Sequence, residues 1–404
     1  MESLDGFRKS ARVWIEEHCP ASLRGSGPGI NRRGDRVAYA NPDVQLWFDR
    51  LGEKGWTAPT WPVEYGGGGL SSGEARVVTE EITRFGCPLP PNSSGLTMLG
   101  PVLLEYGNEE QKREHIPKIA RGQRIWCQGY SEPGSGSDLA GLQTRAEDKG
   151  DHFLVNGSKI WTSGADHSDW IFCLVRTDPD AEKHAGISFL LFDMKSPGVS
   201  VAPITLISGE SDFCQVFFEN VEVPKRDLVG GLGAGWTIAK RLLQFERSMV
   251  AGANSGTGSA GENYRLRGSA ADVNLADLAK ENLGEREDRV AEPLVRDAIA
   301  QNMLDQACFS ATVSRSGAEA KGAEGPGVAS SFFKYYSSEL SKRRYELLVS
   351  IRGTQVFGWE GQGFSDVELA TAREWLNSKG RSIEGGTSEI QLNIVAKRVL
   401  GLPD

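Results

Sequence analysis

The sequence predicts an α+β fold in which a helical segment, an antiparallel β-domain and a second helical segment follow one another. Apolar residues recur at helical spacing before residue 122 and again after Pro224. Between these stretches they form short alternating runs separated by turn residues, which is typical of strands. Because 404 residues are too many for one ordinary core, several domains are expected. The changes in periodicity predict domains at 1–122, 123–230 and 231–404.

The first segment is expected to be mostly helical. Its runs carry apolar residues at every third or fourth position, and Gly122 closes the last of them. A glycine-rich connection precedes the third run. The expected helices are "SARVWIEEH" (10–18), "LWFDRLGEKG" (46–55), "EARVVTEEITRFG" (74–86) and "GNEEQKREHIPKIARG" (107–122).

The middle segment changes to strand-like runs. In "HFLVNGSKIWTS" (152–163), the pair Asn156-Gly157 stands between two such runs and predicts a β-hairpin. Four further runs with turn residues between them continue the pattern, so we expect either a barrel or a small sandwich. These runs are "DWIFCLVRTD" (169–178), "GISFLLFDM" (186–194), "GVSVAPI" (198–204) and "CQVFFENVEVP" (214–224).

Helices return after Pro224. The glycines of "GGLGAGW" (230–236) have the wrong spacing for a dinucleotide-binding motif and are expected to turn the chain into a helix. A stretch at 256–289 is poor in large apolar residues, so it is either a long excursion or a segment that faces a partner. The expected helices are "GWTIAKRLLQFERSMVAG" (235–252), "LVRDAIAQNMLDQACFSATV" (294–313) and "ASSFFKYYSSELSKRRYELLVSI" (329–351).

The composition excludes several classes of protein. A net charge of −9 argues against nucleic acid as a main partner. The longest apolar run, "WIFCLV" (170–175), is too short for a membrane span, and the N-terminus lacks an export signal, so a cytoplasmic protein is expected. Six widely spaced cysteines without a C-x-x-C pair predict reduced thiols. The histidine and cysteine spacings predict no metal site.

Two stretches of the middle segment combine glycine, hydroxyl and aromatic residues. "YSEPGSGSDLAG" (130–141) follows a predicted strand, and its glycines free backbone amides that suit a polar or negatively charged ring system. Its composition is also that of an ordinary Ser/Gly loop. "WTSG" (161–164) adds an aromatic plate and two hydroxyls, which lie close to that loop if the strands pair as expected.

These stretches resemble the flavin-contacting segments of the acyl-CoA dehydrogenase family, and "EGGTSEIQLNIVAKRVLGLP" (384–403) resembles its closing signature. With "PTWPVEYGGGG" (59–69) and the 107–122 run, the resemblance covers nearly the whole chain in order. It implies the family's three-domain fold with a C-terminal four-helix bundle, FAD as cofactor, an acyl-CoA substrate and an electron-transfer flavoprotein as acceptor. The FAD-binding residues it implies are Tyr130, Ser131, Gly136, Ser137, Trp161, Ser163, Thr387 and Glu389.

The resemblance also implies the reaction, in which a carboxylate removes the α-proton of the thioester while the β-hydride passes to the flavin. The product is the trans-2-enoyl-CoA. It implies substrate contacts at Ser137, Arg247 and Gly385, the last through its backbone N–H. Many family members carry the basic glutamate directly before Gly-Thr-Ser, where this chain has Gly385, and Glu384 is one residue too early.

Glu246 is the expected base. It falls in a helical stripe with positions 236, 239, 243 and 250, which are apolar. Desolvation there would raise its pKa toward the range in which a base works best. A buried glutamate paired with an arginine is the alternative interpretation. Isovaleryl and long-chain members of the family take their base from an "ER" pair on this helix, which "FERSMVAG" matches.

Glu389 has a structural interpretation. Ser388 to Gln391 fits an S-x-x-Q capping box that makes Glu389 the first helical residue, where the helix dipole would keep its pKa low. We therefore expect Glu389 to support the flavin site and not to abstract the proton.

Half of the usual cofactor site is missing. The family's R-x-x-F-G motif has no counterpart in 256–289, and "QVFGWEG" (355–361) has Trp359 where the family's adenosine-side segment has glycine. The simplest explanation is an α2β2 tetramer in which a second acyl-CoA dehydrogenase-like subunit supplies the other half, as in bacterial enzymes for steroid side chains or dicarboxylates. An inactive partner subunit, an acyl-CoA oxidase and a flavin monooxygenase remain alternatives.

Overall fold

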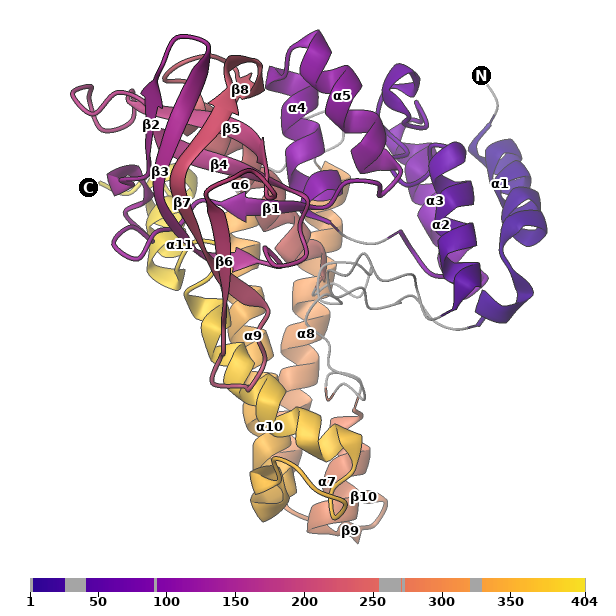
Figure 1. Ribbon diagram of the computed structural model, residues 1–404. Helices are drawn as coiled ribbons and strands as arrows, with labels where there is room; N and C mark the ends of the chain where they lie inside the picture. Colours follow the sequence, from indigo (N-terminus) through magenta and orange to yellow (C-terminus); the bar gives the residue numbers. More distant parts are fainter. Residues whose placement is uncertain are drawn as a thin grey trace. The chain divides into compact units, whose positions relative to one another are not determined.

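The computed structural model describes residues 3–25, 41–90, 93–253, 270, 273–319 and 329–403, without the side chains of 247–253, 317–319 and 329. The predicted order of a helical segment, a β-domain and a second helical segment is confirmed (Figure 1). The chain divides into two compact units. The first comprises Met1–Ile204 and Asp212–Leu243, and the second comprises Thr205–Ser211 and Gln244–Asp404.

Four helices of the first unit, α1, α2, α3 and α5, lie where the sequence predicts them. The short helix α4 was not predicted. Ser71 caps α3 through a reciprocal bond with Glu74, and Asn108 caps α5 in the same way with Gln111. Trp47 of α2 is fully buried in the core that α1, α2 and α3 share. The helices are α1 (Leu4–His18), α2 (Pro42–Glu53), α3 (Ser72–Arg84), α4 (Gly100–Tyr106) and α5 (Glu109–Ala120).

The β-domain is a mixed eight-stranded sheet with the order β6-β7-β3-β2-β4-β5-β8 and with β1 on β4. The sheet is mainly antiparallel, as predicted, but β1 pairs with β4 in parallel and β2 meets β4 in parallel at one position. The strands are β1 (Trp126–Gly129), β2 (Arg145–Asp148), β3 (His152–Ser163), β4 (Trp170–Arg176), β5 (Ile187–Asp193), β6 (Val199–Ile204), β7 (Phe213–Pro224) and β8 (Leu228–Val229).

The hairpin predicted at Asn156-Gly157 is wrong, because β3 runs through both residues as one strand. The ladder with β7 shifts register between Val155 and Gly157, where two β7 residues, Glu219 and Asn220, oppose Asn156, so the bulge lies in β7 and Asn220 has φ +53°. The Asn156 side chain accepts from the Asn220 N–H at 2.9 Å. A Cβ on Gly157 would lie 2.8 Å from Thr144 Cα, so the glycine permits close contact between backbones and does not make a turn.

The second unit is built from long helices, and α9 packs against α8, α10 and α11 (Figure 1). Part of the polar stretch at 256–289 folds into α7 and a small hairpin, whereas 256–269 and 271–272 lie outside the described residues. The elements are α6 (Gly235–Ala253, shared with the first unit), α7 (Leu275–Leu283), β9 (Glu285–Arg286), β10 (Arg289–Val290), α8 (Pro293–Glu319), α9 (Ala329–Arg352), α10 (Asp366–Ser378) and α11 (Ser388–Ile394). Among the described helices, none is long and apolar enough to cross a bilayer.

The cysteines differ from the prediction of six reduced thiols. Cys19, which caps α1, and Cys87, which follows α3, form a disulfide across a separation of 68 residues. Both side chains lie in the core that α1, α2 and α3 share. Sequence spacing could not show this pairing, because it depends on how these helices pack.

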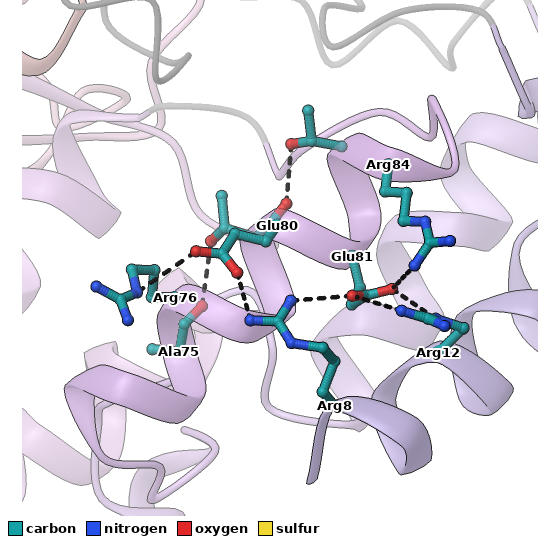
Figure 2. A network of polar contacts seen from close by, with 9 residues as sticks. Arg8, Arg12, Ala75, Arg76, Glu80, Glu81 and Arg84 are labelled. Carbon is teal, nitrogen blue, oxygen red and sulfur yellow. Dashed lines mark hydrogen bonds and ion pairs between the residues drawn. The ribbon is translucent and has the colours of Figure 1, made fainter. Parts of the chain in front are cut away.

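A carboxylate surrounded by arginines joins α1 to α3 (Figure 2). Glu81 is 2% exposed and accepts from Arg8 Nη1 at 3.0 Å and from Arg12 Nε at 3.0 Å. Arg84 Nη1 lies 3.8 Å away. The hydrogen bond from Arg12, assisted by Arg8, keeps the pKa of Glu81 below its ordinary value although burial opposes this. The charge on Glu81 therefore stabilises the helix pair.

We expect Glu81→Gln to lower the free energy of unfolding at pH 7 by about 2 kcal/mol, because it weakens charged hydrogen bonds to two arginines. The lowered pKa means that the folded state stabilises the ionised form, so this stability is present above pH ~4.3 and is lost as the pH falls through the folded pKa. Urea denaturation at pH 7 and pH 3 should therefore show a difference between wild type and variant that shrinks in acid. Glu80→Gln, at a more exposed residue that bonds Arg8, is the control. An equal loss in that control, or a difference that persists in acid, would contradict the prediction.

Candidate active site

The loop at residues 130–138, which we call the glycine loop, follows β1 and folds back on itself. The Glu132 N–H donates to the Ser135 carbonyl at 3.0 Å, and the Ser135 N–H donates to the Glu132 carbonyl at 2.9 Å. Apart from the adjoining residues, no atom of the described part of the chain lies within 4 Å of the place that a Cβ would occupy on Gly134 or Gly136. The tip of the loop thus presents bare backbone to open space.

A buried ion pair fixes the base of the glycine loop. Lys159 of β3 is fully buried, and its Nζ donates to Glu132 Oε1 at 2.8 Å and to the Tyr130 carbonyl at 3.1 Å. Glu132 also accepts from the backbone N–H groups of Gln143 at 2.6 Å and Thr144 at 2.9 Å. Burial acts to raise the pKa of Glu132, but Lys159 and these donors hold it below its ordinary value. The pair is therefore ionised and ties the loop to the sheet.

The predicted residues of the glycine loop differ in exposure. Tyr130 is buried, with its ring at the edges of Phe172 and Phe189. Ser131 is half-buried, and its carbonyl accepts from the Ile160 N–H at 2.8 Å. The two other predicted residues, Gly136 and Ser137, are exposed.

Trp161 has an unusual backbone conformation. Its φ is +60°, a left-handed value that bulky residues rarely adopt, and its side chain is 53% exposed. The register between β3 and β7 shifts between Lys159 and Thr162, so a bulge turns Trp161 outward while Thr162 is buried and Ile160 is half-buried. Ser163 is also exposed. A strained, exposed tryptophan is typical of a functional contact.

The C-terminal glycine pair adopts left-handed conformations, with φ +56° at Gly385 and +87° at Gly386. Gln391 is fully buried, and its Nε2 donates to the Gly385 carbonyl at 3.1 Å and to the Gly386 carbonyl at 3.4 Å. A Cβ on Gly386 would clash with Gln391 Nε2. The glycine pair is therefore held against α11.

The predicted capping box at Ser388 is wrong. Thr387 is the N-cap of α11, and its hydroxyl accepts from the Ile390 N–H at 3.3 Å. Gln391 does not reach back to the cap because its amide binds the glycine pair. The pKa of Glu389 is lowered, as expected, because its own N–H and the Thr387 side chain hydrogen-bond to its carboxylate.

Glu246 lies on α6 close to Gly385. An ideal Cβ on Gly385 would lie 3.2 Å from Glu246 Oε1. Glu246 is half-buried, as are Trp236 and Leu243 of the predicted stripe, so the expectation of a buried stripe is too strong. Ile238, Ala239 and Leu242 are buried on α6, and of these only Ala239 belongs to the stripe.

Two further expectations concern α6 and the 355–361 segment. Arg247 lies on α6, but its side chain is outside the described residues. The Arg373 guanidinium lies over the Trp359 ring, 4.2 Å from the ring centroid. Arg373 also donates to the carbonyls of Trp359 at 3.1 Å and of Ser208 at 3.2 Å. Trp359 is thus packed against neighbouring residues of its own unit.

The domain families of acyl-CoA dehydrogenases match this chain in order. The N-terminal domain matches residues 2–123, the middle domain matches 127–221 and the C-terminal domain matches 233–400. Acyl-CoA dehydrogenase IpdE1 of Mycolicibacterium smegmatis is 34% identical over 418 residues, which cover 100% of this chain and 99% of the relative. The chain belongs to the acyl-CoA dehydrogenase family.

Solved structures of acyl-CoA dehydrogenases have the same fold. A variant of the Tcur3481-Tcur3483 steroid ACAD aligns with a TM-score of 0.72 and 28% identity and covers 99% of both chains. The ChsE4-ChsE5 complex from Mycobacterium tuberculosis aligns with a TM-score of 0.71 and 26% identity, covering 100% of this chain and 98% of the other. The protein is thus an oxidoreductase of the acyl-CoA dehydrogenase type, and the members of this family are flavoproteins.

The sequence interpretation missed the residues that hold this dehydrogenase's loops. Lys159 lies an even number of residues from the buried Phe153 and Val155 of β3, so the three side chains are expected on the same face of the strand. This alternation alone could have shown that a charged side chain points inward. The role of Gln391 had no such signal, because its amide crosses to the glycine pair only in the folded chain.

We expect Lys159→Met to destabilise this unit by about 3–5 kcal/mol, because it leaves the Glu132 carboxylate buried without its cation. Lys149→Met, which removes an exposed ion pair with Glu147 on the neighbouring strand, should cost less than about 1 kcal/mol. Thermal denaturation of the two variants, prepared in the same way, measures both effects. Similar losses in the two variants would show that the buried pair does not determine the stability of the loop.

Proposed function

We propose that this chain oxidises the Cα–Cβ bond of an acyl-CoA thioester to the trans-2-enoyl-CoA, with Glu246 as the base and FAD as the cofactor. The proximity of Glu246 Oε1 to Gly385 carries this proposal. A side chain at position 385, where many family members have their glutamate, would start 3.2 Å from that oxygen. The carboxylate of Glu246 therefore occupies the space into which the usual base would extend.

The first unit fits the flavin expected for the family. The backbone at Gly136 faces open space, Ser137 and Ser163 are exposed, and Trp161 is held outward at a cost in backbone conformation. With Ser131 and Tyr130, these residues would hold FAD, and the family resemblance assigns Thr387 and Glu389 to the same cofactor. When bound, FAD supplies the two-electron acceptor for the β-hydrogen. No group of three or more metal-ligating side chains occurs in the part of the chain that the structure describes.

The chain's own residues would perform the proton chemistry. Glu246 would take the α-proton onto its carboxylate. The Gly385 N–H would donate to the thioester oxygen as negative charge develops there, an interaction whose loss typically costs about 3–4 kcal/mol in the barrier. Ser137 and Arg247 would contact the substrate.

The acyl group and the partners are inferred from relatives. Similarity to a protein named as a steroid ACAD and to a complex of two different chains, ChsE4 and ChsE5, favours an α2β2 assembly acting on a steroid-derived acyl-CoA. The packing of Trp359 against Arg373 supports the assembly of two different subunits. A bulky side chain stands in the segment that resembles the adenosine site, so a second subunit would supply that site. An electron-transfer flavoprotein would then accept the electrons.

We expect Glu246→Gln to lower kcat by at least 10²-fold, because the amide cannot accept the proton. The assay uses the purified enzyme, co-expressed with a neighbouring paralogous subunit, and a ferrocenium acceptor with a panel of acyl-CoAs. Glu384→Gln is the control at the other glutamate near Gly385 and should keep most of its activity. Full turnover in Glu246→Gln would refute the assignment, and oxygen consumption without an added acceptor would indicate an oxidase.

We expect Trp161→Asn to weaken FAD binding by at least tenfold and to raise the melting temperature of the flavin-free protein. Asparagine tolerates the left-handed backbone but lacks the aromatic plate. Fluorescence titration with FAD and thermal denaturation measure the two effects. Trp161→Phe, which keeps an aromatic ring, is the control and should retain most of the affinity. Unchanged affinity in the asparagine variant would remove Trp161 from the flavin site.

A further inference from the structure

A lysine buried on α9 anchors the segment that leads into the glycine pair. Lys334 is 1% exposed, and its Nζ donates to the Arg381 carbonyl at 2.9 Å. The same carbonyl accepts from the Ser338 hydroxyl at 3.1 Å. Because Gly385 follows Arg381 by four residues, these bonds fix the start of the loop that positions its N–H.

The same lysine lies close to the proposed base. The place of a Cβ on Gly385 is 3.2 Å from Glu246 Oε1 and 3.9 Å from Lys334 Cε, so both side chains approach one point. Burial lowers the pKa of Lys334, and nearby carboxylates act against this. In decreasing order of their effect, these carboxylates are Glu384 before Gly385, Glu246 on α6, Glu339 on α9 and Glu389 on α11.

We propose that Lys334 is a positioning residue for the dehydrogenation, in which its ammonium anchors the Arg381 carbonyl and keeps the Glu246 carboxylate ionised. This inference rests on the proposed function, because it assigns Lys334 a role toward the proposed base. Burial disfavours the charged form of a carboxylate, and a base must be ionised to accept a proton. A buried cation that approaches the same point from α9 favours the ionised form and is itself stabilised by the surrounding acids.

Three variants separate the charge of Lys334 from its hydrogen bond. Lys334→Gln keeps a donor for the Arg381 carbonyl but removes the charge, Lys334→Met removes both, and Lys334→Arg keeps the charge. We expect the acid limb of the kcat/KM profile to move upward by about one pH unit in the glutamine and methionine variants and to stay in place for arginine. Lys342→Met, which removes an ion pair with Glu339 farther along α9, should leave the limb unchanged.

A second readout does not depend on turnover. Infrared difference spectra recorded during a pH titration should show a protonated carboxyl band that persists to higher pH in Lys334→Gln and disappears in the Lys334→Gln/Glu246→Gln double variant. An unshifted acid limb and band in folded Lys334→Gln, or equal loss of activity at all pH values, would overturn the inference. If Glu246→Gln retains full turnover, the proposed function fails first. If Glu246→Gln is inactive and the limb is unshifted, only the role of Lys334 fails.

Discussion

The ion pair between Glu132 and Lys159 is the interaction on which the candidate flavin site depends. Two charges lie inside the β-domain, where desolvation is costly. They persist because Lys159 and two backbone N–H groups make four hydrogen bonds, three to the Glu132 carboxylate and one to the Tyr130 carbonyl. This arrangement leaves no freedom at the base of the glycine loop. The tip can therefore present unprotected backbone without collapsing onto the sheet.

The two units use buried lysines in the same way. In each, an ammonium donates to a backbone carbonyl of a glycine-containing segment and lies near a carboxylate. Lys159 donates to the Tyr130 carbonyl and to Glu132. Lys334 donates to the Arg381 carbonyl and approaches Glu246. A lysine suits this task because its long apolar stem packs in the core while its head forms several hydrogen bonds. Loops rich in glycine carry a large entropy cost on ordering, and such anchors offset it.

Periodicity was sufficient to predict the order of the segments and nearly all of the long helices, because those features follow from local spacing. It failed where one residue pair can serve two purposes. Asn156-Gly157 has the composition of a turn, yet the pair lies within one continuous strand, where it contacts Asn220 and Thr144. Glu246 could be found from its helix, but its approach to Gly385 depends on residues far apart in the chain. The Cys19–Cys87 pairing was missed for the same reason.

The two neighbouring glycines of the C-terminal loop differ in what they allow during evolution. At Gly386, any side chain would meet the buried amide of Gln391, so this position can change only if position 391 changes with it. At Gly385, a side chain would meet only the tip of a carboxylate and a flexible lysine stem. A lineage that introduced an acidic residue there and lost the one on α6 would move the reactive group from α6 to the loop before α11, and the left-handed backbone at position 385 would make that change costly unless the loop also changed.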